Sequence, residues 1–384
     1  MVISTVFLPE GRSATMGDMK RYWVAFNRVH GIGAVRFASL LERFGDLESA
    51  WNASPQALVA SGIGPLAVQR LLEARAACDL DVEMARLEKA GVEVVTWLDE
   101  SYPRQLRQAP HAPPVIYLRG RLVPADDRAV AVVGTRTPTP YGQSVARDLA
   151  AALAVHGVTV VSGLARGIDA ISHRAALEAG GRTMAILGSG LDQIYPAEHR
   201  QLAEEIVEHG ALLSDYALGT RPEAANFPPR NRIISGLARA VVVVEAGEES
   251  GALITARFAA DQGRDVFAVP GSIYHRASRG TNRLIQDGAA PMLAPEDVLK
   301  SLESGYVPLN MPPAAAETDD PIERAVLGCL GSEPSHIDEV VALAGRTVPE
   351  VTAALAMLEL KGLVTHVGAM NYVRSGASAE GQGL

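Results

Sequence analysis

Apolar residues follow two different spacings along the chain, and each spacing predicts a different kind of element. Between residues 21 and 90 they recur at helical intervals, which predicts helices over residues 36–44, 55–60, 65–77 and 80–90. Between residues 128 and 300 they form continuous runs, at residues 129–133, 158–162, 183–187, 211–214, 240–245 and 265–269. Such runs are typical of parallel strands buried on both faces. Because helix-length segments separate them, this part is predicted to be an α/β fold with a doubly wound, mainly parallel sheet.

The C-terminal part has the pattern of a small separate domain. Three helix-start signals occur in it: Asp320 before Pro321, Ser335-x-x-Asp338, and Thr347-x-x-Glu350. Residues 363–367 and 371–374 then predict a hairpin across a glycine. Three helices followed by a hairpin are the pattern of a winged-helix domain.

A short motif occurs twice in the helical part. Gly31-Ile32-Gly33 precedes the helix predicted at 36–44, and Gly62-Ile63-Gly64 precedes the helix at 65–77. Such a hairpin turns backbone N–H groups toward a phosphate at a helix N-terminus, and it is the helix-hairpin-helix signature of sequence-independent DNA binding. No lysine cluster flanks the motifs, so a purely structural packing role stays open beside a secondary DNA contact at Gly31, Gly33, Gly62 and Gly64.

These patterns divide the chain into six parts. The expected division is a loose tail at 1–20, a helix-hairpin-helix or SAM-like domain at 21–90, an extended Rossmann-like core at 91–302, a linker rich in Pro, Ala and acidic residues at 303–320, a winged-helix domain at 321–374 and a second tail at 375–384. Two short strands, near residues 92–97 and 115–118, are expected to extend the core.

Composition and charge narrow the class of protein. Of the 384 residues, 48% are hydrophobic and 21% charged, which is a globular balance, and no apolar run is long enough to span a membrane. The N-terminus lacks a signal-peptide pattern, and the two cysteines, far apart, exclude a disulfide scaffold; both indicate a cytoplasmic protein. The net charge is −9, but residues 301–384 hold 4 basic and 11 acidic residues and carry −7 of it. Acidity is therefore concentrated in the C-terminal segment and does not exclude a nucleic-acid partner for the rest.

Glycines, arginines and one aromatic residue gather in loops near the ends of the predicted strands, where open α/β sheets bind ligands. The relevant loops are Gly134-Thr135-Arg136, Ser162-Gly163-Leu164-Ala165-Arg166-Gly167-Ile168-Asp169, Gly188-Ser189-Gly190 and Asn226-Phe227-Pro228-Pro229-Arg230-Asn231-Arg232. Their backbone amides can approach an anion, four arginines add positive charge, and Phe227 offers a stacking face for a base. The combination favours a single-strand binding pocket over a small-cofactor site, with turn glycines and structural ion pairs as the alternative.

Enzyme motifs are a poor match. Gly134-Thr-Arg-Thr-Pro-Thr is not the dinucleotide fingerprint, and Gly163-x-x-x-Gly167-Ile168 lacks the spacing and lysine of a P-loop. Asp169 and His173 stand one helical turn apart and could form an acid–base or metal-binding pair. An acidic residue in the first turn of a helix, however, more often interacts with the free amides at the helix N-terminus. We expect no catalytic residue, no metal and no cofactor.

Several longer boxes resemble the DNA-processing protein A family (DprA, also called Smf). They are the loop 162–169, Phe227-Pro-Pro-Arg230-Asn231-Arg232-Ile-Ile-Ser-Gly236, Val244-Glu245-Ala to Thr255-Ala, Gly263-Arg264 to Pro270-Gly271, and Tyr102-Pro103 to Gly120. The boxes cover residues 102–290, and the flanking domains match variable attachments of that family. Family members often have lysine at the position of Arg166, where the charge is kept.

The resemblance implies a non-enzymatic protein that binds and protects incoming single-stranded DNA and loads the RecA recombinase onto it during natural transformation. It also implies a homodimer through the Rossmann-like domain. The implied pocket residues are Gly134, Arg136, Ser162, Gly163, Arg166, Gly167, Phe227, Arg230, Asn231 and Arg232.

Two other functions stay open from the sequence. The first is a nucleotide phosphoribohydrolase of the lysine-decarboxylase-like class, although the segment after Glu245 lacks that class's PGGxGT order. The second is a transcription regulator acting through the winged helix. Its third helix, near residues 348–361, is expected to turn Glu350, Ala353, Ala356 and Glu359 outward, so we expect it not to bind duplex DNA by itself.

Overall fold

The computed structural model describes residues 16–303, 320–330, 335–360, 364–366 and 370–374. The chain separates between residues 305 and 306 into two compact units, each described by itself. The predicted tail residues 1–15 and 375–384, and residues 304–319 of the predicted linker, lie outside the described residues.

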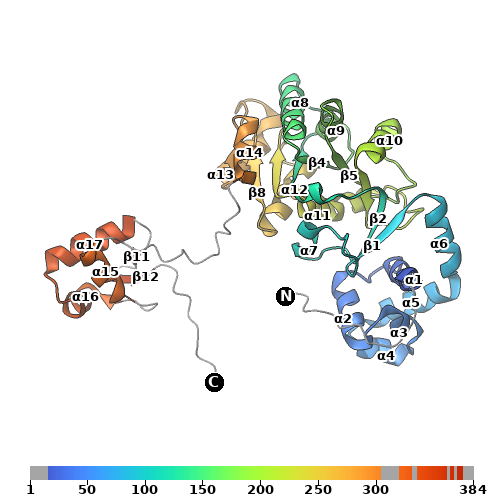
Figure 1. The fold of residues 1–384 in the computed structure, drawn as a ribbon, viewed down its shortest axis with the longest axis horizontal. Helices are drawn as coiled ribbons and strands as arrows, with labels where there is room; N and C mark the ends of the chain where they lie inside the picture. The colour runs from blue at the N-terminus through green and yellow to red at the C-terminus, as the bar shows by residue number, and fades with distance from the viewer. Residues whose placement is uncertain (1–15, 304–319, 331–334, 361–363, 367–369, 375–384) are drawn as a thin grey trace. The chain divides into compact units, whose positions relative to one another are not determined.

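The helices of the first part of the first unit are seen in Figure 1, and they pack around aromatic side chains. These helices are α1 (Met16–Asn27), α2 (Ala34–Phe44), α3 (Leu47–Asn52), α4 (Pro55–Ala60), α5 (Pro65–Ala77) and α6 (Leu80–Lys89). The rings of Trp23 and Phe26 lie 5.7 and 6.1 Å from that of Phe37, and all three are buried. Burying Trp23 and Phe26 anchors α1, which begins at Met16, so the prediction of a loose tail was wrong for residues 16–20. The sequence also missed α3, which is as short as α4 but lacks the proline that marks the first turn of α4.

The rest of the first unit is a nine-stranded sheet. Its strands are β1 (Glu93–Thr96), β2 (Val115–Gly120), β3 (Ala129–Val133), β4 (Thr159–Ser162), β5 (Thr183–Ile186), β6 (Ala211–Ser214), β7 (Ala240–Val243), β8 (Asp265–Ala268) and β9 (Ala290–Pro291). Their order is β1-β2-β6-β5-β4-β3-β7-β8-β9. From β6 to β9 every neighbouring pair is parallel, whereas β1 pairs antiparallel with β2, and β2 with β6. The chain therefore winds one way from β3 to β6 and the other way from β7 to β9, so its direction switches between β3 and β7.

Helices cover both faces of this sheet, as its continuous apolar strands require (Figure 1). Val130 and Val132 of β3 pack into the core shared with α8 (Pro140–Val155), α9 (Ile168–Glu178) and α14 (Pro295–Glu303). Ala131 and Val133 face the other core, shared with α7 (Arg104–Gln108), α11 (Phe227–Leu237) and α12 (Gly251–Asp261). The remaining helices of this unit are α10 (Arg200–His209), α13 (Arg279–Gln286), and the short η1 (Pro124–Asp127), η2 (Ala197–His199), η3 (Ala224–Asn226) and η4 (Arg276–Ser278).

The second unit is a three-helix domain with a small sheet. It contains α15 (Pro321–Gly328), β10 (Ser335–His336), α16 (Ile337–Ala344), α17 (Val348–Leu360), β11 (Val364–His366) and β12 (Asn371–Arg374), with strand order β10-β12-β11. Asp320 caps α15 as predicted, and the Thr347 hydroxyl donates to the Glu350 carboxylate (2.7 Å) before α17. The predicted cap Ser335 was wrong: Ser335 pairs in β10, and His336 caps α16 instead.

Within the described residues, no single helix is long and apolar enough to cross a membrane. The pair α16 and α17 reaches that length and composition only together, across a bend of 112°. Both helices bury apolar side chains in the core of the second unit, among them Val340, Val351, Leu355 and Leu358.

Candidate nucleic-acid interface

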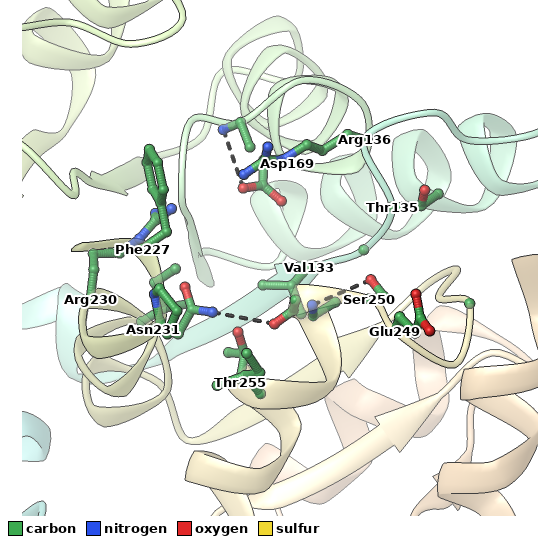
Figure 2. A pocket seen from close by; sticks show the side chains of 18 of the residues that line it. Val133, Thr135, Arg136, Asp169, Phe227, Arg230, Asn231, Glu249, Ser250 and Thr255 are labelled. Atoms are coloured by element: carbon green, nitrogen blue, oxygen red, sulfur yellow. Dashed lines mark hydrogen bonds between the residues drawn. The ribbon is translucent and has the colours of Figure 1, made fainter. Parts of the chain in front are cut away.

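A cavity of about 850 Å³ opens where the winding of the sheet switches between β3 and β7. Its walls come from the loop after β3 (133–136), the loop after β4 (165 and 169), the start of α11, the loop after β7 (247–250), and Arg276 and Arg279. Figure 2 shows Arg136 and Asp169 on one side, Phe227, Arg230 and Asn231 on a second, and Glu249 and Ser250 across the opening. The cavity lies where an open α/β sheet binds ligands, because two adjacent loops diverge there.

Phe227, the first residue of α11, contacts two arginines. The Arg136 guanidinium lies 5.7 Å from the centre of its ring and the Arg230 guanidinium 5.8 Å. The ring of Tyr195 lies 5.8 Å away on a further side. Phe227 is half-buried, whereas Arg136 and Tyr195 are exposed. Cation–π contact holds the phenyl ring in one orientation while leaving part of it open to the cavity.

Arg230 is the buried member of this group, with 4% of its surface exposed. Its Nη1 donates to the carbonyl of Ile186 at the end of β5 (2.5 Å). Burial lowers the pKa of Arg230 to about 10, so the side chain still carries its charge at neutral pH. The guanidinium passes directly over Gly163, where a Cβ would overlap it. The glycine is therefore needed because the arginine occupies that space.

The other predicted loop residues hold together the loops beside the cavity. Asp169 accepts hydrogen bonds from the amides of Gly163 (3.1 Å) and Ala165 (3.2 Å), and burial raises its pKa. Gly167 has φ +75°, and a side chain there would strike the carbonyl of Thr135. A Cβ at Gly134 would come within 2.6 Å of Ile168. These residues let the loops after β3 and β4 pack closely together.

Two of the side chains with possible chemistry serve as structural anchors. Ser162 is fully buried, and its hydroxyl donates to the carbonyl of Val132 (2.7 Å). His173 is fully buried beside Thr183, with Nδ1 and Oγ1 2.6 Å apart, and desolvation lowers its pKa to about 3. Its hydrogen-bond partner is thus Thr183, whereas Asp169 serves the loop amides, which supports the structural interpretation of this pair over the acid–base one.

Two of the four arginines predicted at this rim do not line the cavity. Arg166 pairs with Glu198 (Nε to Oε1, 2.5 Å) and points into solvent. Arg232 pairs with Asp215 (Nη2 to Oδ2, 2.7 Å) and lines a different cavity. The structure brings Arg136, Phe227, Arg230 and Asn231 together as predicted, and the Asn231 amide donates to the carbonyl of Gly251 (3.3 Å).

Sequence reasoning missed three residues of the cavity wall, Tyr195, Arg276 and Arg279. They stand in segments that follow β5 and β8, outside the glycine-rich boxes. The sequence feature that could have indicated these three residues was their position after predicted strands.

Comparison with known proteins decides the family. The model of DNA recombination-mediator protein A matches residues 93–303, and that of the DprA winged helix domain matches residues 310–370. The chain belongs to the DprA family. It is 37% identical to Protein Smf of Synechocystis sp., over 92% of this chain and 98% of that relative. It is 40% identical to Protein Smf of Escherichia coli, over 77% of this chain and 80% of that relative.

Two solved DprA structures are similar to the chain. The X-ray structure of DprA from Streptococcus pneumoniae is 33% identical, with a TM-score of 0.64, and the match covers 75% of this chain and 98% of that one. DprA from Helicobacter pylori, described as having a unique single-stranded DNA binding mode, is 30% identical with a TM-score of 0.50, over 56% of this chain and 97% of that one. The predicted resemblance and the predicted Rossmann-like, helical and winged-helix fold are thereby confirmed.

The structure does not support Glu245 as a catalytic residue of the hydrolase alternative. Glu245, which follows β7, is 3% exposed. Its carboxylate accepts hydrogen bonds from the amide (2.9 Å) and the hydroxyl (2.5 Å) of Thr139. Both oxygens thus hold the start of α8, which leaves this carboxylate no access to a sugar.

Proposed function

We propose that this DprA family member binds single-stranded DNA in the cavity between β3 and β7. The observation that carries the proposal is that the guanidinium groups of Arg136 and Arg230 both contact the ring of Phe227 in that cavity. Aromatic rings stack on any base, and arginines bind phosphates of any sequence. A site with both groups suits a strand whose bases are free, and it reads no particular sequence.

The two arginines have different roles in this proposal. Arg136 is exposed and can move onto a phosphate. Arg230 is fixed by the carbonyl of Ile186 and gives the cavity a permanent positive charge beneath the ring. Arg276 and Arg279, which also line the cavity, add further positive charge to it. The Helicobacter pylori relative, a single-stranded DNA binder, supports this assignment.

We further propose that the protein is a mediator and not an enzyme: it protects incoming single-stranded DNA and loads RecA onto it during natural transformation. The family description as a recombination mediator supports this role. The engagement of Glu245 with Thr139 supports the absence of hydrolysis.

The experiment that tests the function compares labelled single-stranded and duplex oligonucleotides over a salt series, followed by RecA assembly on strands coated with a single-strand-binding protein. We expect tighter binding of the single strand, with a negative log–log salt slope, and faster RecA assembly when the protein is present. Equal affinity for duplex, or no acceleration of assembly, would contradict the proposal.

We propose that the protein is a homodimer through its Rossmann-like unit, so that two cavities hold one strand with greater avidity than either alone. Sedimentation equilibrium at micromolar concentration is expected to give about twice the chain mass of 40.5 kDa. A single species at the chain mass would disprove the dimer.

The winged-helix domain is not part of the proposed site. Ala353 and Glu359 of α17 are exposed, as the sequence predicted, Glu350 is partly exposed, and the side chain of Ala356 lies outside the described residues. An acidic third helix would repel a phosphate backbone, so the expectation that this domain does not bind duplex DNA by itself stays a prediction. Titration of residues 315–384 with duplex DNA at low salt tests it, and micromolar binding would contradict it.

A further inference from the structure

A second cavity of about 1180 Å³ separates the first hairpin of the helical region from the core of the same unit. Residues 27–36 form one wall, and residues 113–114 and 215–220 form the opposite wall. The proposed site uses none of these residues, and the helix-hairpin-helix motifs also have no role in it. The second cavity and the first helix-hairpin-helix motif lie at the same place, because Gly31 and Gly33 line the cavity.

The two cavities share one wall, the segment 220–227. Phe227, Pro222 and Ala224 line the first cavity, whereas Asn226, Glu223 and Thr220 line the second. The hydroxyl of Tyr216 donates to the carbonyl of Asn226 (3.3 Å), which ties the segment to the loop after β6. A strand that leaves the Phe227 ring therefore has only this short segment to cross before it reaches the second cavity.

The helices that follow the two hairpins start differently from α3, α4 and α6. Within the helical region, α3, α4 and α6 are capped by the side chains of Asp46, Ser54 and Asp79, which accept hydrogen bonds from first-turn amides. The helices after the hairpins, α2 and α5, have Gly33 and Gly64 at their N-cap positions and no side-chain cap. The first-turn amides of α2 are therefore open to an external anion, whereas α5 offers fewer, because Pro65 has no N–H and the amide of Ala67 donates to the carbonyl of Gly64 (2.9 Å).

Two arginines meet at the same hairpins. Arg36 donates to the carbonyl of Gly31, and its Nη2 lies about 4.0 Å from the position of a Cβ on Gly64, so it stands between both hairpins. Arg70 donates to the carbonyl of His30 (3.3 Å). Each bond uses one of the five N–H donors of a guanidinium. In the described residues neither arginine makes an ion pair with a carboxylate.

Other cations of this cavity are already neutralised. Arg28 pairs with Glu83 (2.7 Å), Arg86 with Asp192 (3.3 Å) and Arg232 with Asp215 (2.7 Å). The uncompensated positive charge is thus concentrated at the hairpin end, beside the uncapped helices. A purely structural role explains the bonds to the two carbonyls, but it does not require two arginines without a carboxylate partner at the same hairpins.

We propose that single-stranded DNA leaving the Phe227 cavity crosses residues 222–226 and that its phosphates bind the paired hairpins, at Arg36, Arg70 and the first turns of α2 and α5. The inference rests on the proposed function and adds a second, purely electrostatic contact surface to it. Since the contacts are to phosphates, the surface contributes affinity for long strands and no base preference.

The test uses the full chain and oligothymidylates of about 6 and about 25 nucleotides, the shorter chosen to fill one cavity only. The double variant Arg36→Ala/Arg70→Ala is expected to bind the long strand at least about tenfold more weakly at low salt, with its log–log salt slope shallower by about 1.4, or 0.7 for each phosphate that no longer has its arginine. Binding of the short strand should change less than twofold. Arg43→Ala, an exposed arginine in the last turn of α2, is the control and should change neither.

A second variant guards against a folding defect. Val35 is 65% exposed and lies at the second position of α2, where a carboxylate favours the helix. Val35→Glu should therefore leave the thermal unfolding temperature unchanged while it weakens long-strand binding. The matched control is Gln201→Glu, which adds the same charge at the second position of α10.

The outcomes separate this inference from the proposed function. Equal losses for short and long strands, no loss beyond the controls, or a larger loss for duplex than for single strand would each overturn the hairpin surface. Failure of the core site would show instead as short-strand binding that is insensitive to Phe227→Ala.

Discussion

Phe227→Ala is expected to weaken binding of a short single strand by about 1–3 kcal/mol, roughly fivefold to 150-fold, with little change in the salt slope. The ring supplies a stacking surface, and stacking releases no counterions. In the structure the ring contacts Arg136, Arg230 and Tyr195 at the cavity mouth and stays half-buried, so its removal leaves the sheet core intact.

Arg136→Ala provides the matched comparison, because it removes charge from the same place. We expect its salt slope to become shallower by about 0.7, since one phosphate no longer has a cationic partner. Arg174→Ala, which removes an exposed arginine of α9 that does not line the cavity, serves as the charge control. Fluorescence anisotropy over a salt series measures both affinity and slope. Unchanged affinity in both variants would place the DNA elsewhere on the protein.

The position of the cavity could be predicted from the sequence because it depends on chain order alone. Continuous apolar runs identify buried parallel strands, and the loops after β3, β4 and β7 must then meet at one edge of the sheet. The glycines of these loops were informative as well. Gly163 and Gly167 stand where a side chain would collide with Arg230 or with the carbonyl of Thr135.

The direction of each arginine could not be predicted in the same way. Arg230 and Arg232 are two residues apart on α11, which separates them by about 200° around the helix, so they cannot both face one cavity. Which of the two faces the Phe227 cavity depends on Asp215, whose carboxylate forms an ion pair with Arg232. Arg166 pairs with Glu198, more than thirty residues away, and no local pattern shows such a contact.

The pair of Asp215 and Arg232 leads to the second large effect, which concerns stability and not DNA. Their side chains are only 14% and 21% exposed, and Oδ1 of Asp215 and Nη1 of Arg232 are buried without a further hydrogen bond. Removing Arg232 leaves the Asp215 carboxylate with little solvent and without its ion-pair partner. We expect Arg232→Ala to lower the free energy of unfolding by about 3 kcal/mol at neutral pH, toward the lower end for a broken buried pair because some solvent contact remains.

The destabilisation should depend on pH in a defined direction. Burial raises the pKa of Asp215 in the folded protein even with Arg232 present, and Arg232 opposes that rise. Without the arginine the folded pKa rises further above the unfolded value, so the native variant binds a proton that the unfolded chain releases. The variant therefore keeps its stability at a pH below the pKa of Asp215 in the unfolded chain, and loses it as the pH rises through the pKa of Asp215 in the folded variant. The difference in free energy of unfolding between Arg232→Ala and the unaltered protein should therefore become smaller as the pH falls from 7 toward about 5.

Urea unfolding followed by tryptophan fluorescence can measure this effect in the full chain, since Trp23, Trp51 and Trp97 all lie in the first unit. Arg232→Ala/Asp215→Asn should recover part of the stability, because it removes the stranded charge. Short-strand affinity under native conditions should stay unchanged, since Arg232 does not line the Phe227 cavity. A variant of full stability that binds the short strand weakly would instead restore Arg232 to the DNA site.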